Sequence, residues 1–182
     1  MLRCFIVIFF LNLITNANAD YKEKIIDKLK NTYNINFDFE QNINGKIETG
    51  NCIIEYPKKI FCEYDKANNK VLVSNGKSLV IKTISSYYRY PIHKTPLDLI
   101  LDKNFLINKI SNLDGRIVDK YYINYQLLEN ENEISIFFDN QTFNLIGWQT
   151  KDIYQNLSIT FISSVKTNEV IDKKFFKLPS QN

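Results

Sequence analysis

The stretch TGNCIIEYPKKIFCEYDKANNKVLVSNGKSLVI, residues 49–81, decides the fold of this chain. Short apolar or alternating runs follow one another in it, and turn-forming residues separate them without any helical interval. This pattern predicts a curved meander of antiparallel strands. The stretch contains no cluster of residues with catalytic chemistry. It therefore favours a sheet that holds an apolar ligand over a sheet that transforms a substrate.

The chain begins with the features of a cleavable export signal. Arg3 supplies the positive charge, residues 5–14 the apolar core, and residues 17–19 the small-residue pattern that signal peptidase recognises, so we expect cleavage after Ala19. The apolar core is short of the ~20 residues of a membrane-spanning helix, which makes an uncleaved anchor the alternative. Cys4 precedes this core, so we expect no lipid anchor and a periplasmic product.

The mature chain has the size of one domain. Removal of 19 residues from 182 leaves 163, residues 20–182, which suffice for one substantial core. Lys and Arg total 23 against 20 Asp and Glu, and the basic residues are scattered. This balance does not indicate a nucleic-acid partner. We expect a monomer.

The residue types of metal sites and active sites are sparse. His93 is the only histidine, which leaves no zinc-binding pattern, and the mature cysteines do not sit at a helix N-terminus. Nothing in the sequence selects a catalytic pair of carboxylates. We therefore expect no metal, no cofactor and no enzymatic activity.

Cys52 and Cys62 flank the first predicted hairpin. With residues 56–58 as its loop, Ile54 lies opposite Ile60 and Cys52 lies opposite Cys62. Cross-strand partners have Cβ atoms about 4.5–5.5 Å apart, so a small adjustment would allow a disulfide in an oxidising compartment. A two-residue turn would instead shift the pairing by one and leave two free, buried cysteines. We predict the disulfide.

Strands also precede and follow a central helical segment. An N-terminal helix capped by Asp20 is predicted from the apolar positions at helical spacing, which are Ile25, Ile26, Leu29 and Tyr33. Thr95 as a cap and Pro96 at the first position predict a helix over residues 96–110, broken near residues 103–104. The predicted strands are residues 35–41, 45–56, 60–64, 70–74, 78–84, 118–128, 133–138, 143–150 and 157–163, with a last piece near residues 175–176. This order excludes a Rossmann-type alternation and favours an antiparallel sheet with helices on one face.

Several motifs resemble, in order and spacing, those of the LolA family of periplasmic outer-membrane lipoprotein carriers. They are Phe39-Glu40-Gln41, Thr49-Gly50, Pro57, residues 73–79, Thr95-Pro96, Asp152 and residues 168–179. The resemblance implies an α+β, mainly β fold: an incomplete, half-open antiparallel β-barrel covered by an N-terminal helix and a central helical segment, with a hydrophobic cavity for acyl chains. It also implies the partners of such a carrier, namely lipoprotein acyl chains, an inner-membrane ABC lipoprotein-release complex and an outer-membrane lipoprotein receptor.

Two positions depart from the family pattern. Tyr56 stands where the family carries an arginine that bonds helix carbonyls and fastens the lid, and its hydroxyl offers one donor in place of five. Gln155 replaces the glycine of the motif that begins at Asp152. We therefore expect the fastening of the lid and the shape of that turn to differ from the family pattern.

Strand alternation predicts which side chains line the cavity. The predicted lining residues are Ile54, Tyr56, Ile60, Tyr64, Leu79, Ile81, Ile134, Ile136, Phe138, Leu157, Ile159 and Phe161. Each of them could instead pack beneath the helices without touching lipid. We expect Leu97, Ile100 and Leu101 to form the lid that fills the empty cavity. By resemblance, the rim near Ile60 and Phe61 is the predicted docking surface for partner proteins.

Other members of this fold group give the alternative functions. We do not expect an anchored receptor, because Cys4 is not placed for lipidation, or an envelope-stress sensor, which would need a second domain. A carrier of a different amphiphile, a phospholipid or a glycolipid, remains the alternative, because the same concave surface would suit it.

Overall fold

The computed structural model describes residues 17–66, 68–129, 132–151 and 155–181. The predicted export signal falls mainly on residues 1–16, which lie outside the described residues. Asp152, from the motif with the replaced glycine, also lies outside them.

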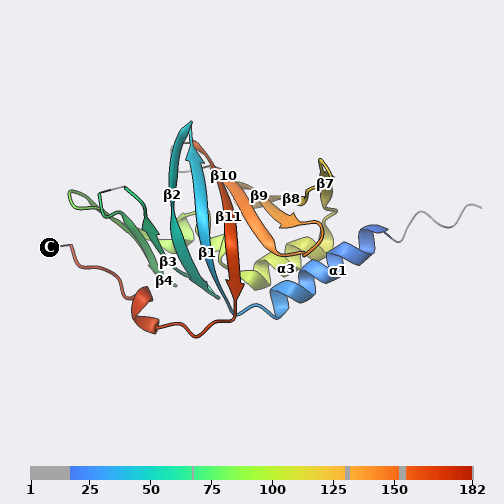
Figure 1. Ribbon diagram of the computed structural model, residues 1–182, viewed down its shortest axis with the longest axis horizontal. Helices are drawn as coiled ribbons and strands as arrows, with labels where there is room; N and C mark the ends of the chain where they lie inside the picture. Colours follow the sequence, from blue (N-terminus) through green and yellow to red (C-terminus); the bar gives the residue numbers. More distant parts are fainter. Residues whose placement is uncertain (1–16, 67, 130–131, 152–154, 182) are drawn as a thin grey trace, which may run out of the picture.

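Within the described residues, eleven antiparallel strands form one sheet, which confirms the predicted fold class (Figure 1). They are β1 (Asn34–Ile43), β2 (Lys46–Glu55), β3 (Lys59–Tyr64), β4 (Val71–Asn75), β5 (Ser78–Lys82), β6 (Tyr87–Pro91), β7 (Arg116–Val118), β8 (Tyr122–Glu129), β9 (Asn132–Asp139), β10 (Leu145–Lys151) and β11 (Leu157–Thr167). Their spatial order is β6-β5-β4-β3-β2-β1-β11-β10-β9-β8-β7. Because β6 and β7 end this order and do not pair with each other, the barrel is half-open.

The hairpin of β2 and β3 has the predicted register. Residues 56–58 connect the two strands, Ile54 pairs with Ile60, and Cys52 pairs with Cys62. The two sulfur atoms are joined in a disulfide. The three-residue loop therefore excludes the shifted pairing that would separate the cysteines.

The turn between β1 and β2 shows how local sequence sets the pairing. Asn44 and Gly45 have φ angles of 50° and 88°, the positive values that a two-residue hairpin turn requires and that Asn-Gly adopts readily. The side chain of Asn42 accepts a hydrogen bond from the Gly45 N–H at 2.7 Å. This turn fixes the register of β1 against β2 along ten residue pairs.

The helices cover one face of the sheet. They are α1 (Ala17–Lys30), α2 (Leu97–Ile100), α3 (Lys103–Asn112) and the 3-10 turn η1 (Ile92–Lys94). A second 3-10 turn, η2 (Lys173–Phe176), packs against β3 and β4 on the opposite face. In Figure 1 the strands β1, β2 and β11 lie in front, α2 lies behind them, and α1 and α3 run side by side at one end. We call the covered face the inner face and the opposite face the outer face. No helix among the described residues is long and apolar enough to cross a bilayer.

The helix ends differ from the prediction. Helix α1 begins at Ala17, so Asp20 lies inside it and is not its cap. Pro96 is the N-cap residue of α2, while the Thr95 hydroxyl donates backwards to the carbonyl of Ile92 at 2.8 Å. Both predictions of a cap were wrong, because a polar residue before an apolar run marks a helix start only within a few residues.

The predicted break in the central helix is confirmed, one to two residues earlier than expected. Leu101 and Asp102 separate α2 from α3. The carboxylate of Asp102 accepts hydrogen bonds from the N–H groups of Asn104 and Phe105, both at 3.1 Å. This cap starts a new helix with a new direction.

Three strand predictions require correction. The sequence analysis missed β6, whose Tyr-rich segment follows directly on β5. The predicted strand over residues 118–128 is divided into β7 and β8 by a turn in which Asp119 and Lys120 have positive φ angles. The predicted strand piece at Phe175 and Phe176 is the 3-10 turn η2. Short apolar pairs do not distinguish a strand from a turn, which explains the last error.

Candidate functional site: a covered apolar concavity

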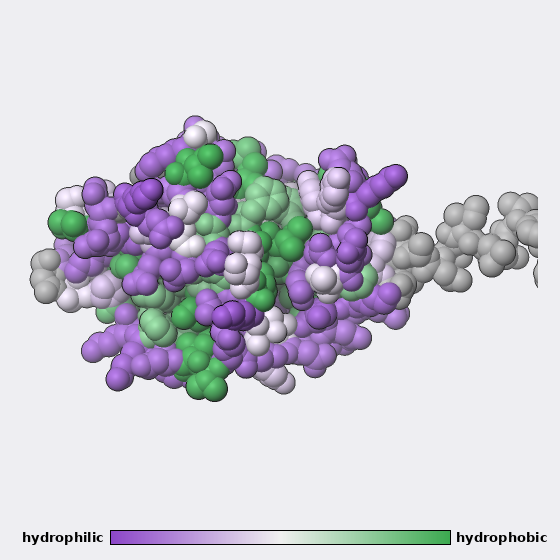
Figure 2. All heavy atoms as spheres, in the orientation of Figure 1, coloured by the Kyte–Doolittle hydropathy of each residue, from purple (hydrophilic) through white to green (hydrophobic). Residues whose placement is uncertain are grey.

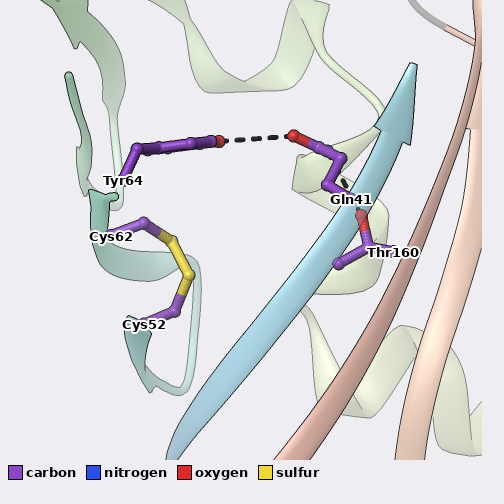
Figure 3. Close-up of a disulfide and its surroundings, with 5 residues drawn as sticks. All are labelled: Gln41, Cys52, Cys62, Tyr64 and Thr160. Carbon is purple, nitrogen blue, oxygen red and sulfur yellow. Dashed lines mark hydrogen bonds between the residues drawn. A yellow bond between two sulfur atoms is a disulfide. The ribbon is translucent and has the colours of Figure 1, made fainter. Parts of the chain in front are cut away.

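The inner face of the sheet carries a continuous apolar surface. Six of the predicted lining residues are at most 3% exposed and belong to one cluster, and they are Ile54, Ile60, Leu79, Ile134, Ile136 and Phe138. Tyr56, Tyr64 and Ile81 are partly buried against the same cluster. The Cys52–Cys62 disulfide lies on this face, with both cysteines buried (Figure 3).

Helix residues fill the concavity. Ile100 and Leu101, two of the predicted lid residues, are 1% and 0% exposed within the same cluster, and Leu97 packs against it. Four further helix residues that the sequence analysis did not assign to the site also enter the cluster, and they are Ile25, Leu29, Leu106 and Ile110. Their spacing of four along each helix is the pattern that could have indicated this role. In this state the apolar face packs against protein rather than against a ligand.

The predicted orientation of β11 was wrong. Leu157 and Phe161 are 38% and 46% exposed on the outer face, and Ile159 lies on that face between them. Ser158, Thr160 and Ile162 are buried on the inner face instead. Both faces of this strand carry apolar residues, so alternation alone does not select the buried one.

Contacts across β9, β10 and β11 explain the outward position of Phe161. Gly147 pairs with Phe161 on one side and with Phe137 on the other. The rings of Phe137 and Phe161 stack over it with centroids 5.7 Å apart. A Cβ atom on Gly147 would approach the Thr160 carbonyl oxygen to 2.3 Å, so only glycine fits there. In Figure 2 apolar side chains gather across this part of the outer face.

The predicted docking pair does not form one surface. Ile60 is 2% exposed on the inner face, so the prediction that it meets partner proteins was wrong. Phe61 lies on the outer face, but the chain's own Phe175 packs against it with ring centroids 5.0 Å apart. Alternating residues of a strand face opposite sides, which is why the two cannot share a rim.

A pocket of about 240 Å³ opens beside Phe61 on the outer face. Its walls are β3, β4 and the segment that carries η2, with the residues Phe61, Val71, Val73, Asp172, Lys174, Phe175, Lys177 and Pro179. The sheet separates it from the apolar concavity of the inner face.

Lys58, which the sequence analysis did not identify, connects the β2–β3 loop to α2 and the residues that follow it. Its ammonium group lies 2.9 Å from a carboxylate oxygen of Asp98 in α2 and 3.7 Å from one of Asp102. Its backbone N–H also donates to the carbonyl of Leu101 at 2.8 Å. The hydrogen bond with Asp98 raises the pKa of Lys58. Lys58 therefore joins the β2–β3 loop to both ends of the lid.

Tyr56 does not replace the arginine latch. Its hydroxyl is buried and has no hydrogen-bond partner among the described residues, and burial raises its pKa. The tyrosine therefore contributes apolar contacts, and the polar connection to the lid comes from Lys58, two residues further on. Gln155, the other departure from the family pattern, has a φ of 64° and so adopts the conformation that glycine takes most easily.

One end of the inner face is polar. The carboxamide of Gln41 donates to the hydroxyl of Ser158 at 3.0 Å. It also donates to the hydroxyl of Thr160 at 3.2 Å and accepts from that of Tyr64 at 3.5 Å (Figure 3). Glu48, which pairs with Gln41 across the strands, is 9% exposed. None of these residues except Tyr64 was expected at the site, because polar residues in a strand are ordinarily assigned to solvent.

Two lysines neutralise the buried carboxylate of Glu48. Lys70 and Lys46 lie 2.5 Å and 2.7 Å from its oxygens. Burial by itself would raise the pKa of Glu48, but these two ammonium groups more than offset the burial and hold its pKa below the usual value. Lys70 also lies 3.9 Å from the centre of the Tyr64 ring, a cation–π contact.

The described residues contain no group of three or more His, Cys, Asp or Glu side chains arranged to hold a metal ion. The inner face itself is a large apolar surface with a polar end.

A half-open barrel whose apolar inner face is covered by helices is the architecture of a lipid-binding carrier. Residues 28–179 match the family described as outer membrane lipoprotein carrier protein LolA, so the chain belongs to this family of periplasmic carriers. No curated protein sequence is similar enough to count as a match.

Solved structures resemble this chain at low sequence identity. A LolA superfamily protein from Nitrosomonas europaea is 10% identical, with a TM-score of 0.44 over 88% of this chain and 97% of that one. LprF from Mycobacterium bovis is 11% identical, with a TM-score of 0.46 over 85% and 97% of the two chains. MucB in complex with MucA from Pseudomonas aeruginosa is 9% identical, with a TM-score of 0.49 over 89% and 61%.

Proposed function

We propose that this protein carries lipoproteins through the periplasm by binding their acyl chains to its inner face. It accepts them from an inner-membrane ABC lipoprotein-release complex and delivers them to an outer-membrane lipoprotein receptor. The observation that supports this function most directly is the apolar inner face, on which the lid residues Ile100 and Leu101 occupy the place of a ligand.

The energetics of acyl binding explain why such a carrier needs a lid. Each buried methylene contributes about 0.8 kcal/mol, so one sixteen-carbon chain gains on the order of 12 kcal/mol, close to nanomolar affinity. Several fully buried chains would not dissociate on a useful timescale. Displacing α2 from the face that it covers offsets part of this gain. The empty state thus stores the free energy that makes release possible.

The single tryptophan provides a direct binding assay. Trp148 is 6% exposed on the inner face, where its ring meets that of Phe37 edge-on at 6.2 Å. A synthetic triacylated cysteine peptide, titrated into the protein, is expected to change Trp148 fluorescence saturably. The same peptide without acyl chains serves as the control and is expected to leave the fluorescence unchanged.

Hydrogen exchange tests the movement of the lid. Loading with the triacylated peptide is expected to accelerate exchange of the amides of α2, because Leu101 must leave the cluster to admit the chains. Amides of β1, in the centre of the sheet, serve as the internal reference and are expected to stay protected. Unchanged exchange in α2 of the loaded protein would contradict the proposed lid.

The cargo and the export signal belong to the same proposal. Native mass spectrometry of protein purified from its own periplasm is expected to show a bound triacylated polypeptide. A phospholipid or glycolipid alone would favour the carrier of another amphiphile. The mass of the same purified protein also tests cleavage after Ala19, since an intact residue 1 would contradict the proposed signal peptide.

A further inference from the structure

The polar end of the inner face lies away from the lid. Strand β2 runs from Lys46 to Glu55, and Glu48 is near its start, beside the β1–β2 turn. The lid contacts the other end of this strand, through Lys58 in the loop that follows it. Seven residues separate Glu48 from Glu55, about 23 Å of strand. The chains of one bilayer leaflet occupy only ~15 Å, half of the hydrocarbon core.

Hydrogen-bond donors on three strands converge at this end. Gln41 lies on β1, Tyr64 on β3, and Ser158 and Thr160 on β11, and all of them face inward. Figure 3 shows the side chains of Tyr64 and Gln41 directed toward each other. The Gln41 amide is held by two hydroxyl groups, whereas the Tyr64 hydroxyl reaches its acceptor only at 3.5 Å. A bond of that length is weak and is readily exchanged for a shorter one to a ligand oxygen.

The charges at this end also favour an acceptor-rich ligand. The carboxylate of Glu48 contacts two ammonium groups, those of Lys46 and Lys70, so this group of three side chains has one positive charge in excess. Lys70 lies between this carboxylate and the Tyr64 ring. A face that held only hydrocarbon would gain nothing from polar groups that cost free energy to bury.

We propose that Gln41, Tyr64, Ser158 and Thr160 form a binding site for the ester and amide carbonyl oxygens at the head of an acylated ligand. The proposal rests on the acyl-carrier function and adds the orientation of the ligand. The linkage carbonyls lie at the polar end, and the chains extend along the inner face toward α2. Acylated cysteine peptides and glycerophospholipids share this chemistry, so the site recognises the linkage rather than one source of it.

The test compares ester-linked and ether-linked ligands that differ only in these carbonyls. The probes are a diacylglyceryl cysteine peptide, its dialkyl ether analogue, and the corresponding ester and ether forms of phosphatidylglycerol. Trp148 fluorescence gives each dissociation constant. Wild-type protein is expected to prefer the ester form of each pair by roughly threefold to tenfold, the effect of one to two hydrogen bonds.

Gln41→Leu and Thr160→Val are expected to abolish this preference, mainly by weakening the binding of the ester forms. Thr160→Val keeps the side-chain shape, so it decides the question if Gln41→Leu does not fold. Gln149→Leu is the matched control, because it makes the same change on the outer face of β10 and is expected to keep the preference.

The outcomes separate this inference from the function on which it rests. Equal affinity of the wild type for ester and ether forms would overturn the carbonyl site and leave the carrier function intact. A preference that survives both Gln41→Leu and Thr160→Val would likewise overturn it. Failure of the wild type to bind any acylated probe would overturn the carrier function itself. A preference seen with the peptide pair only would assign the site to lipoprotein linkages.

Discussion

At the scale of single residues, burial of polar groups decides the behaviour of the inner face. The hydroxyl of Tyr56 is buried without a partner among the described residues, whereas the buried carboxylate of Glu48 has two. A buried hydroxyl without a hydrogen-bond partner lowers the free energy of unfolding. A buried carboxylate in an ion pair raises it as long as the carboxylate stays charged. Removal of the polar group is therefore expected to be harmless at Tyr56 and destabilising at Glu48.

We expect Tyr56→Phe to leave the free energy of unfolding unchanged or to raise it by up to about 1 kcal/mol, because it removes an unsatisfied hydroxyl. Urea denaturation measures the change. Tyr21→Phe is the matched control: the hydroxyl of Tyr21 donates to the carbonyl of Gly115 at 2.9 Å, and its loss is expected to cost about 1 kcal/mol. Clear destabilisation by Tyr56→Phe would contradict the unpaired state of its hydroxyl.

Glu48 predicts a loss of stability in acid. Its pKa in the folded protein is below the ordinary value of a glutamate, about 4.5, so its ion pairs stabilise the fold above that value and are lost as the pH falls through the lowered pKa. The free energy of unfolding should therefore decrease below pH 4.5. In Glu48→Gln this part of the pH dependence is expected to disappear, with a loss of about 2 kcal/mol at pH 7.

Glu40→Gln provides the comparison for this variant, because Glu40 is exposed on the outer face of β1. Its stability should follow the wild-type curve throughout the titration. If the free energy of unfolding of Glu48→Gln equals that of the wild type both in acid and at pH 7, the assigned ion pairs are contradicted.

At the scale of elements, the lid and the β2–β3 hairpin act together. Lys58 follows the end of β2 by three residues and contacts both ends of α2, and the hydroxyl of buried Ser74 in β4 donates to the Lys58 carbonyl at 2.7 Å. The position of the lid is thus set by a loop whose own position is fixed by a neighbouring strand.

Lys58→Met is expected to loosen the lid. The substitution keeps the length of the side chain but removes its charge, so the amides of α2 should exchange faster in the empty protein and acylated ligands should bind faster. Lys59→Met is the neighbouring control, because Lys59 pairs with Glu55 inside the hairpin at 2.7 Å and does not pair with the lid. Equal rates of amide hydrogen exchange in α2 of the two variants would rule out Lys58 as the residue that holds α2 in place.

The disulfide is expected to stabilise the same hairpin. Joining residues ten apart, it should contribute roughly 3 kcal/mol in the chain-entropy description. The double variant Cys52→Ala/Cys62→Ala should lose an amount of this order in urea denaturation without a reducing agent. Wild-type protein denatured with a reducing agent should approach the value of the variant. Identical stabilities in all three samples would argue against a bridge in solution.

The sequence predicts where strands lie better than it predicts which of their side chains point to the inner face of the sheet. Turns such as Asn44-Gly45 fix the pairing locally, so the register that joins Cys52 to Cys62 follows from loop length alone. The inward face of β11 does not follow in the same way, because Phe161 is held outside by contacts with Phe137 that lie far away in sequence. The role of Lys58 also escapes the sequence, since Asp98 and Asp102 meet it only in the folded chain.

At the scale of the whole molecule, the C-terminal segment leaves the end of β11 and runs past the ends of the strands, and η2 packs against β3 and β4 (Figure 1). Phe175 packs on Phe61, Phe176 is 5% exposed, and Lys173 pairs with Glu55 of β2. The interaction of Phe61 with partner proteins stays a prediction, and it now requires this segment to move aside.

Replacing both phenylalanines with alanine is expected to release the segment. Cleavage by trypsin at Lys173 and Lys174 should become faster, and the unfolding free energy of the sheet should fall by less than the ~3–5 kcal/mol of one core phenylalanine. The segment can detach while the sheet stays folded, which limits the cost. Val170→Ala is the control in the same segment, because Val170 is fully exposed and should alter neither measurement.

The unpaired ends of the sheet give the molecule an adjustable capacity. A closed β-barrel can widen only if hydrogen bonds between two neighbouring strands break. Here the terminal strands β6 and β7 are not hydrogen-bonded to each other, so the curvature of the sheet can change through small changes of twist in every strand pair. If the protein carries acyl chains as proposed, this opening lets one scaffold fit a single chain or several without the loss of a backbone hydrogen bond.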